Sequence, residues 1–161
     1  MIEPLPLPTR RHTKALARAL AGALEAGDAV VLSGPLGSGK TFLTRALCRA
    51  LGLPSSVPVV SPTFPLVRMV DTTPPLAHAD LYRLDSEAEA FDLGLEELRE
   101  TGHILVAEWG ERFPRALGPD SLLVQLGRDP RQAQLSGSGP RGAALARATR
   151  AHPALLDRRS P

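Results

Sequence analysis

Residues 34 to 41, Gly-Pro-Leu-Gly-Ser-Gly-Lys-Thr, match the phosphate-binding pattern G-x-x-x-x-G-K-[ST] at every fixed position. Glycines let a backbone turn through positive φ, so that successive N–H groups can point inward at an anion. We expect Lys40 to reach the terminal phosphates of a nucleotide and the Thr41 hydroxyl to bind Mg²⁺. A helix that begins here would add its dipole at the phosphate end. The loop by itself predicts binding of ATP or GTP.

The segments on either side of this loop have the order that a phosphate site requires. Residues 29 to 33 form a short apolar, β-branched run, and residues 41 to 51 carry apolar side chains at helical spacing. The chain has 17 arginines and only two lysines, Lys14 and Lys40, yet it places lysine in the loop. A glycine-rich turn that binds nothing is the alternative, and the strand, loop and helix order disfavours it.

Hydrolysis or transfer of a phosphoryl group needs a second anchor for the metal ion, and Glu108 is the candidate. It follows the apolar strand expected at 103–107, and the carboxyl ends of strands in open α/β sheets face the ligand crevice. Many phosphate-loop proteins have Asp at this place, and Glu still supplies a carboxylate. The alternative is a surface pairing of Glu108 with Arg112.

Two further polar residues could serve the reaction. Asp80, on the second of two extended segments, could orient or deprotonate a water molecule or support the metal ion. It could equally face solvent from an edge strand. Thr63 could sense the γ-phosphate or its metal, as the residues of order–disorder switches do, although Ser-Pro-Thr is also an ordinary turn sequence.

Four segments in this order resemble the TsaE (YjeE) family: the loop at 34–41, Ser61-Pro-Thr-Phe64, His78-Ala-Asp-Leu-Tyr-Arg-Leu84 and Val106-Ala-Glu-Trp-Gly-Glu-Arg112. The resemblance covers most of residues 5 to 140. Members of this family are small bacterial ATPases of tRNA threonylcarbamoyladenosine biosynthesis. The resemblance therefore implies an ATPase that works with the partner proteins TsaB and TsaD, which install threonylcarbamoyl on the tRNA adenosine next to the anticodon.

The resemblance also implies roles for individual residues, with ATP and Mg²⁺ as cofactors. Thr41 and Glu108 become the metal ligands. Asp80 and Glu108 become the catalytic carboxylates, with Tyr82 near Asp80. The residues expected to contact the nucleotide are Gly34, Gly37, Ser38, Gly39, Lys40, Thr41, Phe42, Thr63 and Arg128.

The remaining elements follow from hydrophobic spacing and turn residues. A helix is expected from Thr9 to Glu25 with Gly27 at its end, and the capping-box spacing at 86–89 opens an acidic helical stretch that breaks at Leu93-Gly94. Paired strands are expected at 65–70 with 76–82, and at 121–126 with 132–135. Together with the resemblance, these elements predict an α/β protein: a P-loop NTPase-like three-layer fold with a mixed parallel/antiparallel central sheet.

Length and composition predict one domain over residues 1–150. The Ala- and Arg-rich segment from Arg141 onward is expected to be helical at most as far as Arg150, and residues 151–161 are expected to form a flexible tail. No apolar run approaches the ~20 residues of a membrane span, and the first residues do not resemble a secretion signal. Cys48, the single cysteine, falls among expected core positions. These features are consistent with cytoplasm, and no membrane partner is expected.

Charge is divided unevenly along the chain. Residues 1–70 carry eight basic and three acidic side chains, residues 71–111 carry two and 11, and residues 112–161 carry nine and three. These segments could be surfaces for different partners, including tRNA directly or within a complex, or simply solvated faces. Two other functions stay open: a small-molecule kinase with a P-loop, and a nucleotide-gated binding module.

Overall fold

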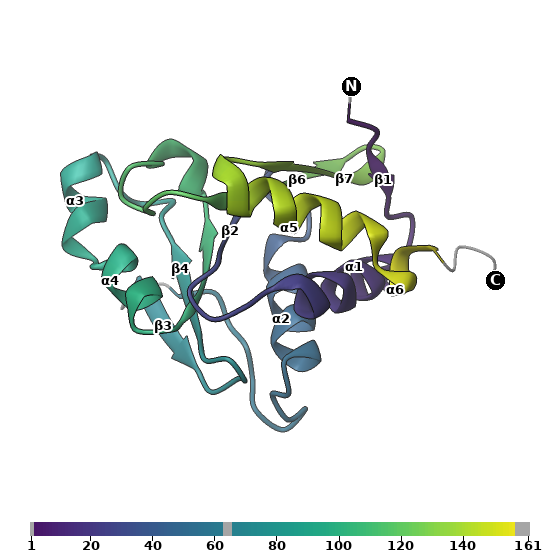
Figure 1. Cartoon of the computed structure of the whole chain (residues 1–161), viewed down its shortest axis with the longest axis horizontal. Helices are drawn as coiled ribbons and strands as arrows, with labels where there is room; N and C mark the ends of the chain where they lie inside the picture. Colours follow the sequence, from purple (N-terminus) through teal and green to yellow (C-terminus); the bar gives the residue numbers. More distant parts are fainter. Residues whose placement is uncertain (1, 63–65, 157–161) are drawn as a thin grey trace.

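The computed structural model describes residues 2–62 and 66–156, and within them one seven-stranded sheet lies between helices (Figure 1). The elements in chain order are β1 (Leu5–Pro6), α1 (Arg10–Ala23), β2 (Ala29–Ser33), α2 (Lys40–Ala50), β3 (Val67–Val70), β4 (Leu76–Asp80), α3 (Glu87–Asp92), α4 (Leu95–Glu100), β5 (Ile104–Glu108), the 3₁₀ turn η1 (Gly110–Arg112), β6 (Ser121–Arg128), β7 (Arg131–Gly137), α5 (Gly139–Ala151) and α6 (Pro153–Leu156).

The strand order is β1-β7-β6-β2-β5-β4-β3. The four central strands β4, β5, β2 and β6 run parallel to one another. At the sides of the sheet, β3 pairs antiparallel with β4, β7 with β6, and β1 with β7. The mixed central sheet predicted from the sequence is therefore confirmed. Both expected strand pairs are also present, as β3 with β4 and as β6 with β7.

Successive residues of β2 enter two different cores because side chains alternate across a strand. Val30 and Leu32 pack into a cluster with residues of α1, α2 and α5, while Ala29 and Val31 pack into a second cluster that includes Ala90 of α3 and Leu95 of α4. Every residue of β2 except Ser33 is buried, as expected for a strand covered on both faces. The three layers predicted from the sequence are thus confirmed.

The first helix is shorter than the predicted span of 9–25. It begins at Arg10 and ends at Ala23, and Leu24 is already extended, with ψ 139°. The Asp28 carboxylate accepts a hydrogen bond from the Glu25 N–H at 2.7 Å, which favours a turn over a further helical residue. Gly27, with φ 89°, lies inside this turn and does not cap the helix.

The C-terminal segment is helical over more residues than predicted. The limit of helix at Arg150 is wrong, because α5 continues to Ala151 and α6 follows at Pro153–Leu156. The reason is tertiary packing, since Leu145 of α5 is fully buried and Leu155 of α6 packs against the same core. Of the tail expected at 151–161, residues 157–161 lie outside the described part of the chain.

Two further predictions, the helix cap at 86–89 and the burial of Cys48, can be compared with the structure. The Ser86 hydroxyl accepts from the Glu89 N–H at 3.2 Å, as a capping box requires, although the Glu89 carboxylate accepts from the N–H of Asp85 instead of that of Ser86. Cys48 is buried as predicted, and burial raises the pKa of its thiol to about 11. In the described ranges 2–62 and 66–156, no helix is long and apolar enough to cross a membrane.

Candidate functional site

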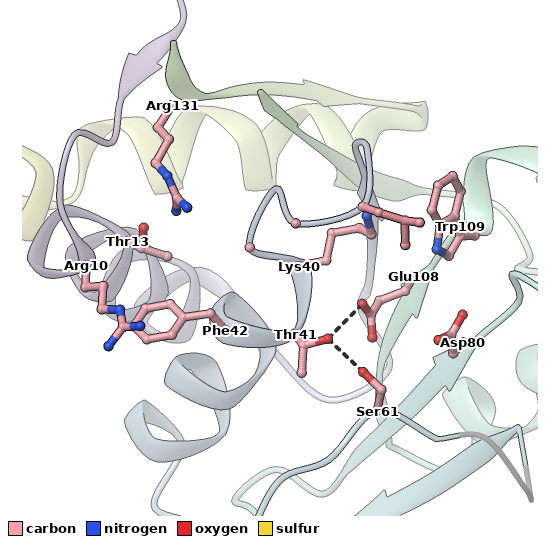
Figure 2. Close-up of a pocket in the computed structure, with 13 residues that line it drawn as sticks. Arg10, Thr13, Lys40, Thr41, Phe42, Ser61, Asp80, Glu108, Trp109 and Arg131 are labelled. Atoms are coloured by element: carbon pink, nitrogen blue, oxygen red, sulfur yellow. Dashed lines mark hydrogen bonds between the residues drawn. The ribbon is translucent and has the colours of Figure 1, made fainter. Parts of the chain in front are cut away.

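The predicted phosphate loop lines a cavity of about 350 Å³ at the carboxyl ends of the central parallel strands (Figure 2). Strand register brings Leu32 of β2, Glu108 of β5 and Asp80 of β4 into one row. The loop between β2 and α2 therefore ends beside both predicted carboxylates. The lining residues of the cavity are Arg10, Thr13, Leu36, Gly37, Gly39, Lys40, Thr41, Phe42, Ser61, Asp80, Glu108, Trp109 and Arg131.

The loop has the backbone that its glycines predict. Gly37 and Gly39 have φ of 79° and 102°, and Gly39 directly precedes α2. A Cβ atom on Gly34 would lie 2.4 Å from the Leu126 carbonyl oxygen and 2.7 Å from the Ser38 Oγ, so only glycine fits there. Within the described residues, the buried Ser38 hydroxyl has no hydrogen-bond partner. A buried donor of this kind suits an anionic ligand, because an unpaired polar group costs free energy.

Lys40 lies beneath this loop and is 6% exposed. Its Nζ donates to the carbonyl oxygens of Gly34 and, at 3.0 Å, Pro35, and it lies 4.5 Å from the centre of the Trp109 ring. Burial lowers the pKa of Lys40, while the negative charges of Glu108, Glu111 and Asp80 oppose that shift. The ammonium group is thus a desolvated donor held at the predicted phosphate end of the cavity.

A row of hydrogen bonds joins the loop helix to two strands. The Thr41 Oγ1 lies 2.7 Å from the Ser61 Oγ and donates to the Glu108 Oε1 at 3.3 Å, and the Glu108 Oε2 lies 2.7 Å from the His78 Nε2. Glu108 is 3% exposed. Hydroxyl and carboxylate oxygens are the hard ligands that Mg²⁺ takes, so Thr41, Ser61 and Glu108 fit a magnesium ion.

The alternative expectation for Glu108, a surface pairing with Arg112, is wrong. Arg112 donates instead to the carbonyl oxygens of Tyr82, at 3.0 Å, and Leu84, at 2.9 Å. It thereby ties η1 to the segment that follows β4. Glu108 is buried at the cavity and is not on the protein surface.

Asp80 ends β4, which is not an edge strand, because β3 lies outside it. The alternative in which Asp80 faces solvent from an edge is therefore wrong. Its carboxylate lines the cavity and accepts from the Tyr82 N–H at 3.1 Å. Burial raises the pKa of Asp80, and repulsion from Glu108 adds to the effect, whereas the Tyr82 N–H and the nearby Lys40 lower it.

Two other predicted residues, Phe42 and Arg128, lie in or beside the cavity. Phe42 lines it, with the Arg10 guanidinium 5.5 Å from the centre of the phenyl ring. Arg128, at the exposed end of β6, lies beside the loop, since a Cβ built on Gly37 would be 3.7 Å from its Cζ. The predicted Thr63 lies outside the described residues.

Sequence reasoning missed several residues of this site. Ser61 belongs to the Ser-Pro-Thr segment, but the prediction rested on Thr63. His78 precedes Asp80 by two residues, and strand periodicity would have placed both on one face. Arg10, Thr13 and Arg131 come from α1 and β7, and no local pattern connects them with the loop.

The chain is similar in sequence to a known protein family. The model of the family described as threonylcarbamoyl adenosine biosynthesis protein TsaE matches residues 7–135 of the chain. The chain is 39% identical over 141 residues to a Streptomyces coelicolor protein named tRNA threonylcarbamoyladenosine biosynthesis protein TsaE, covering 80% of this chain and 92% of that protein. The protein of the same name from Bacillus subtilis is 34% identical over 134 residues, covering 81% and 82%.

The fold has a solved counterpart as well. The crystal structure of Bacillus subtilis YdiB superposes with a TM-score of 0.74 at 26% sequence identity, covering 92% of this chain and 95% of that one. The similarity in sequence and the similarity in fold therefore both extend over most of the chain.

Proposed function

Because the chain belongs to the TsaE family, and hence to tRNA threonylcarbamoyladenosine biosynthesis, we propose that it is an ATPase that binds ATP and Mg²⁺. It acts in this proposal with TsaB and TsaD, which modify the tRNA adenosine next to the anticodon. ATP hydrolysis serves turnover of that assembly and does not itself transfer the threonylcarbamoyl group. A role on tRNA fits a place in the cytoplasm.

The observation that carries the proposal is the 3.3 Å contact between the Thr41 Oγ1 and the Glu108 Oε1. It joins the last fixed residue of the phosphate loop to the end of the neighbouring parallel strand. In phosphate-loop ATPases, a hydroxyl from the loop and a carboxylate from such a strand hold the metal ion. When bound there, Mg²⁺ supplies positive charge next to the phosphates.

The loop supplies the rest of the phosphate site. Gly37, Gly39 and Lys40 line the cavity, and the neighbouring Ser38 hydroxyl has no partner among the described residues. Backbone N–H groups, a hydroxyl and an ammonium group are donors that an anion would accept from. The carbonyl oxygens of Gly34 and Pro35 now accept from Lys40, and phosphate oxygens would make stronger, charge-assisted acceptors.

The far side of the cavity suits the nucleoside. Phe42 offers a flat apolar ring, and the guanidinium groups of Arg10 and Arg131 line the same space. Figure 2 shows these residues on the opposite side of the loop from Asp80 and Trp109. Bases stack favourably on aromatic and guanidinium planes, so this side is the proposed place for adenine and ribose.

Asp80 is the proposed group that positions the attacking water. It is the residue of β4 that pairs with Glu108 of β5, and it lines the cavity. Its carboxylate can accept a hydrogen bond from water on the side away from Tyr82. Glu108, which is bound to Thr41 and His78, is less free to do so.

The test is ATP turnover by the purified chain alone, with candidate small acceptors, and with TsaB, TsaD and tRNA together. We expect slow Mg²⁺-dependent hydrolysis alone and a clear increase in the full mixture. Stoichiometric phosphorylation of a small acceptor would instead establish a kinase. Nucleotide binding without turnover under every condition would leave only a nucleotide-gated binding module.

A further inference from the structure

The two carboxylate oxygens of Glu108 have different partners. Oε1 faces the loop helix and accepts from the Thr41 hydroxyl at 3.3 Å, while Oε2 faces His78 at 2.7 Å. The shorter of the two contacts is the one that lies away from the predicted metal. The carboxylate is therefore held mainly from the side of β4.

His78 is well suited to hold it. The residue is 1% exposed and lies in the middle of β4, with strands paired on both sides. It is in register with Val106, so its ring reaches diagonally toward Glu108 two residues further along β5. A carboxylate only accepts hydrogen bonds, so Nε2 is the donor in this contact.

We propose that His78 is a positioning residue that directs the Oε1 of Glu108 toward Thr41 and toward the metal ion that these two residues would hold. The proposal rests on the function proposed above. Without the imidazole, Oε2 would be buried with no donor, and the carboxylate would turn toward another partner. Groups that orient metal ligands through a second hydrogen bond commonly change metal affinity 10- to 100-fold when removed.

A purely structural role makes a different prediction. If His78 only fills space on its face of the sheet, any side chain that preserves the fold would leave metal binding unchanged. The two roles separate with His78→Leu and His78→Gln. Leucine fills space without a donor, whereas the glutamine Nε2 is as many bonds from Cα as the histidine Nε2 and can donate to the carboxylate.

The experiment is calorimetric titration of each variant with the non-hydrolysable β,γ-imido analogue of ATP, with and without Mg²⁺. His78→Leu should weaken the affinity gained on adding Mg²⁺ by about tenfold. Affinity without Mg²⁺ should stay within about twofold, and His78→Gln should recover most of the loss. His103→Leu is the matched control, because His103 precedes β5 at the end of that strand opposite Glu108.

An unchanged effect of Mg²⁺ in a folded His78→Leu would overturn the inference, and so would an equal loss of affinity with and without Mg²⁺. If His78→Leu does not fold, His78→Asn replaces it, since asparagine is too short to reach Oε2. Equal behaviour of the Asn and Gln variants would then overturn it. Failure of the unmutated chain to bind the analogue, or to respond to Mg²⁺, would instead refute the proposed function.

Discussion

Two buried carboxylates, Asp28 and Glu108, lie at opposite ends of the central strands and differ in how fully they are bound. Asp28, just before β2, accepts from the Arg141 Nε at 2.9 Å, from a second Arg141 nitrogen at 2.6 Å and from the Glu25 N–H at 2.7 Å. Glu108, at the end of β5, has the His78 ring on one oxygen and a 3.3 Å contact with Thr41 on the other.

The difference separates stability from function. Asp28 accepts three hydrogen bonds, two of them from Arg141, and so ties α5 to the turn after α1. The less saturated Glu108 lines an open cavity and retains capacity to accept or coordinate. A buried carboxylate with spare capacity beside a phosphate loop is more informative about function than burial alone.

Replacing the carboxylate at the cavity should have the largest effect. Glu108→Gln removes a negative charge but keeps the shape and an acceptor, so ATP turnover should fall about 10²- to 10³-fold. The free energy of unfolding should change by less than about 1 kcal/mol. Steady-state phosphate release and urea unfolding measure the two quantities. A Glu108→Gln variant that loses stability but retains turnover would contradict the assignment of Glu108 to function and of Asp28 to stability.

Two substitutions in the phosphate loop should affect nucleotide binding and Mg²⁺-dependent turnover to different degrees. Lys40→Ala should weaken ATP binding by about tenfold or more, because a charge-assisted contact to phosphate is lost. Thr41→Ala should mainly lower Mg²⁺-dependent turnover. Trp109 is the only tryptophan, and its ring lies near the Lys40 Nζ, so its fluorescence can follow nucleotide binding. Wild-type behaviour in either variant would remove that residue from the site.

Substitution of Asp28 should show the reverse behaviour. Asp28→Asn weakens the pairing with Arg141, and since the arginine side chain is 36% exposed, the cost should be about 2 kcal/mol of unfolding free energy. Affinity for ATP should stay within about twofold. Urea unfolding and calorimetric titration check the two statements, and a large loss of affinity at normal stability would contradict the assignment of Asp28 to stability.

Asp80 should cost the protein a small amount of stability. Burial raises the pKa of Asp80 in the folded state, so its ionised form opposes folding. This cost is present above the folded pKa and vanishes as the pH falls below the ordinary value of about 3.9. Asp80→Asn should therefore raise the unfolding free energy at pH 7 by less than about 1 kcal/mol.

Urea unfolding at several pH values measures this effect. The advantage of the Asn variant should shrink as the pH falls from the folded pKa toward the ordinary one, while its ATP turnover is lost at every pH. A variant less stable than the unmutated chain at pH 7 would show that the ionised carboxylate of Asp80 stabilises the fold.

Some features were determined by the sequence alone. Residues 34–41 are contiguous, and the conformation of their glycines depends on local sterics, so the loop and its flanking elements could be read directly. The apolar run of β2 and the apolar stripe of α1 are likewise local patterns. Glu108 could be named because it follows an apolar strand, and Asp80 because it is a carboxylate on an extended segment, although the strand expected at 76–82 ends at Asp80.

Only the tertiary structure decided which of these residues meet. The row from Ser61 through Thr41 and Glu108 to His78 depends on the register of β4, β5 and β2, which no segment specifies by itself. The position of α6 and the presence of Arg10 and Arg131 at the cavity likewise depend on packing between segments distant in sequence. Such contacts are set by the fold as a whole, because each is stable only when both partners are already in place.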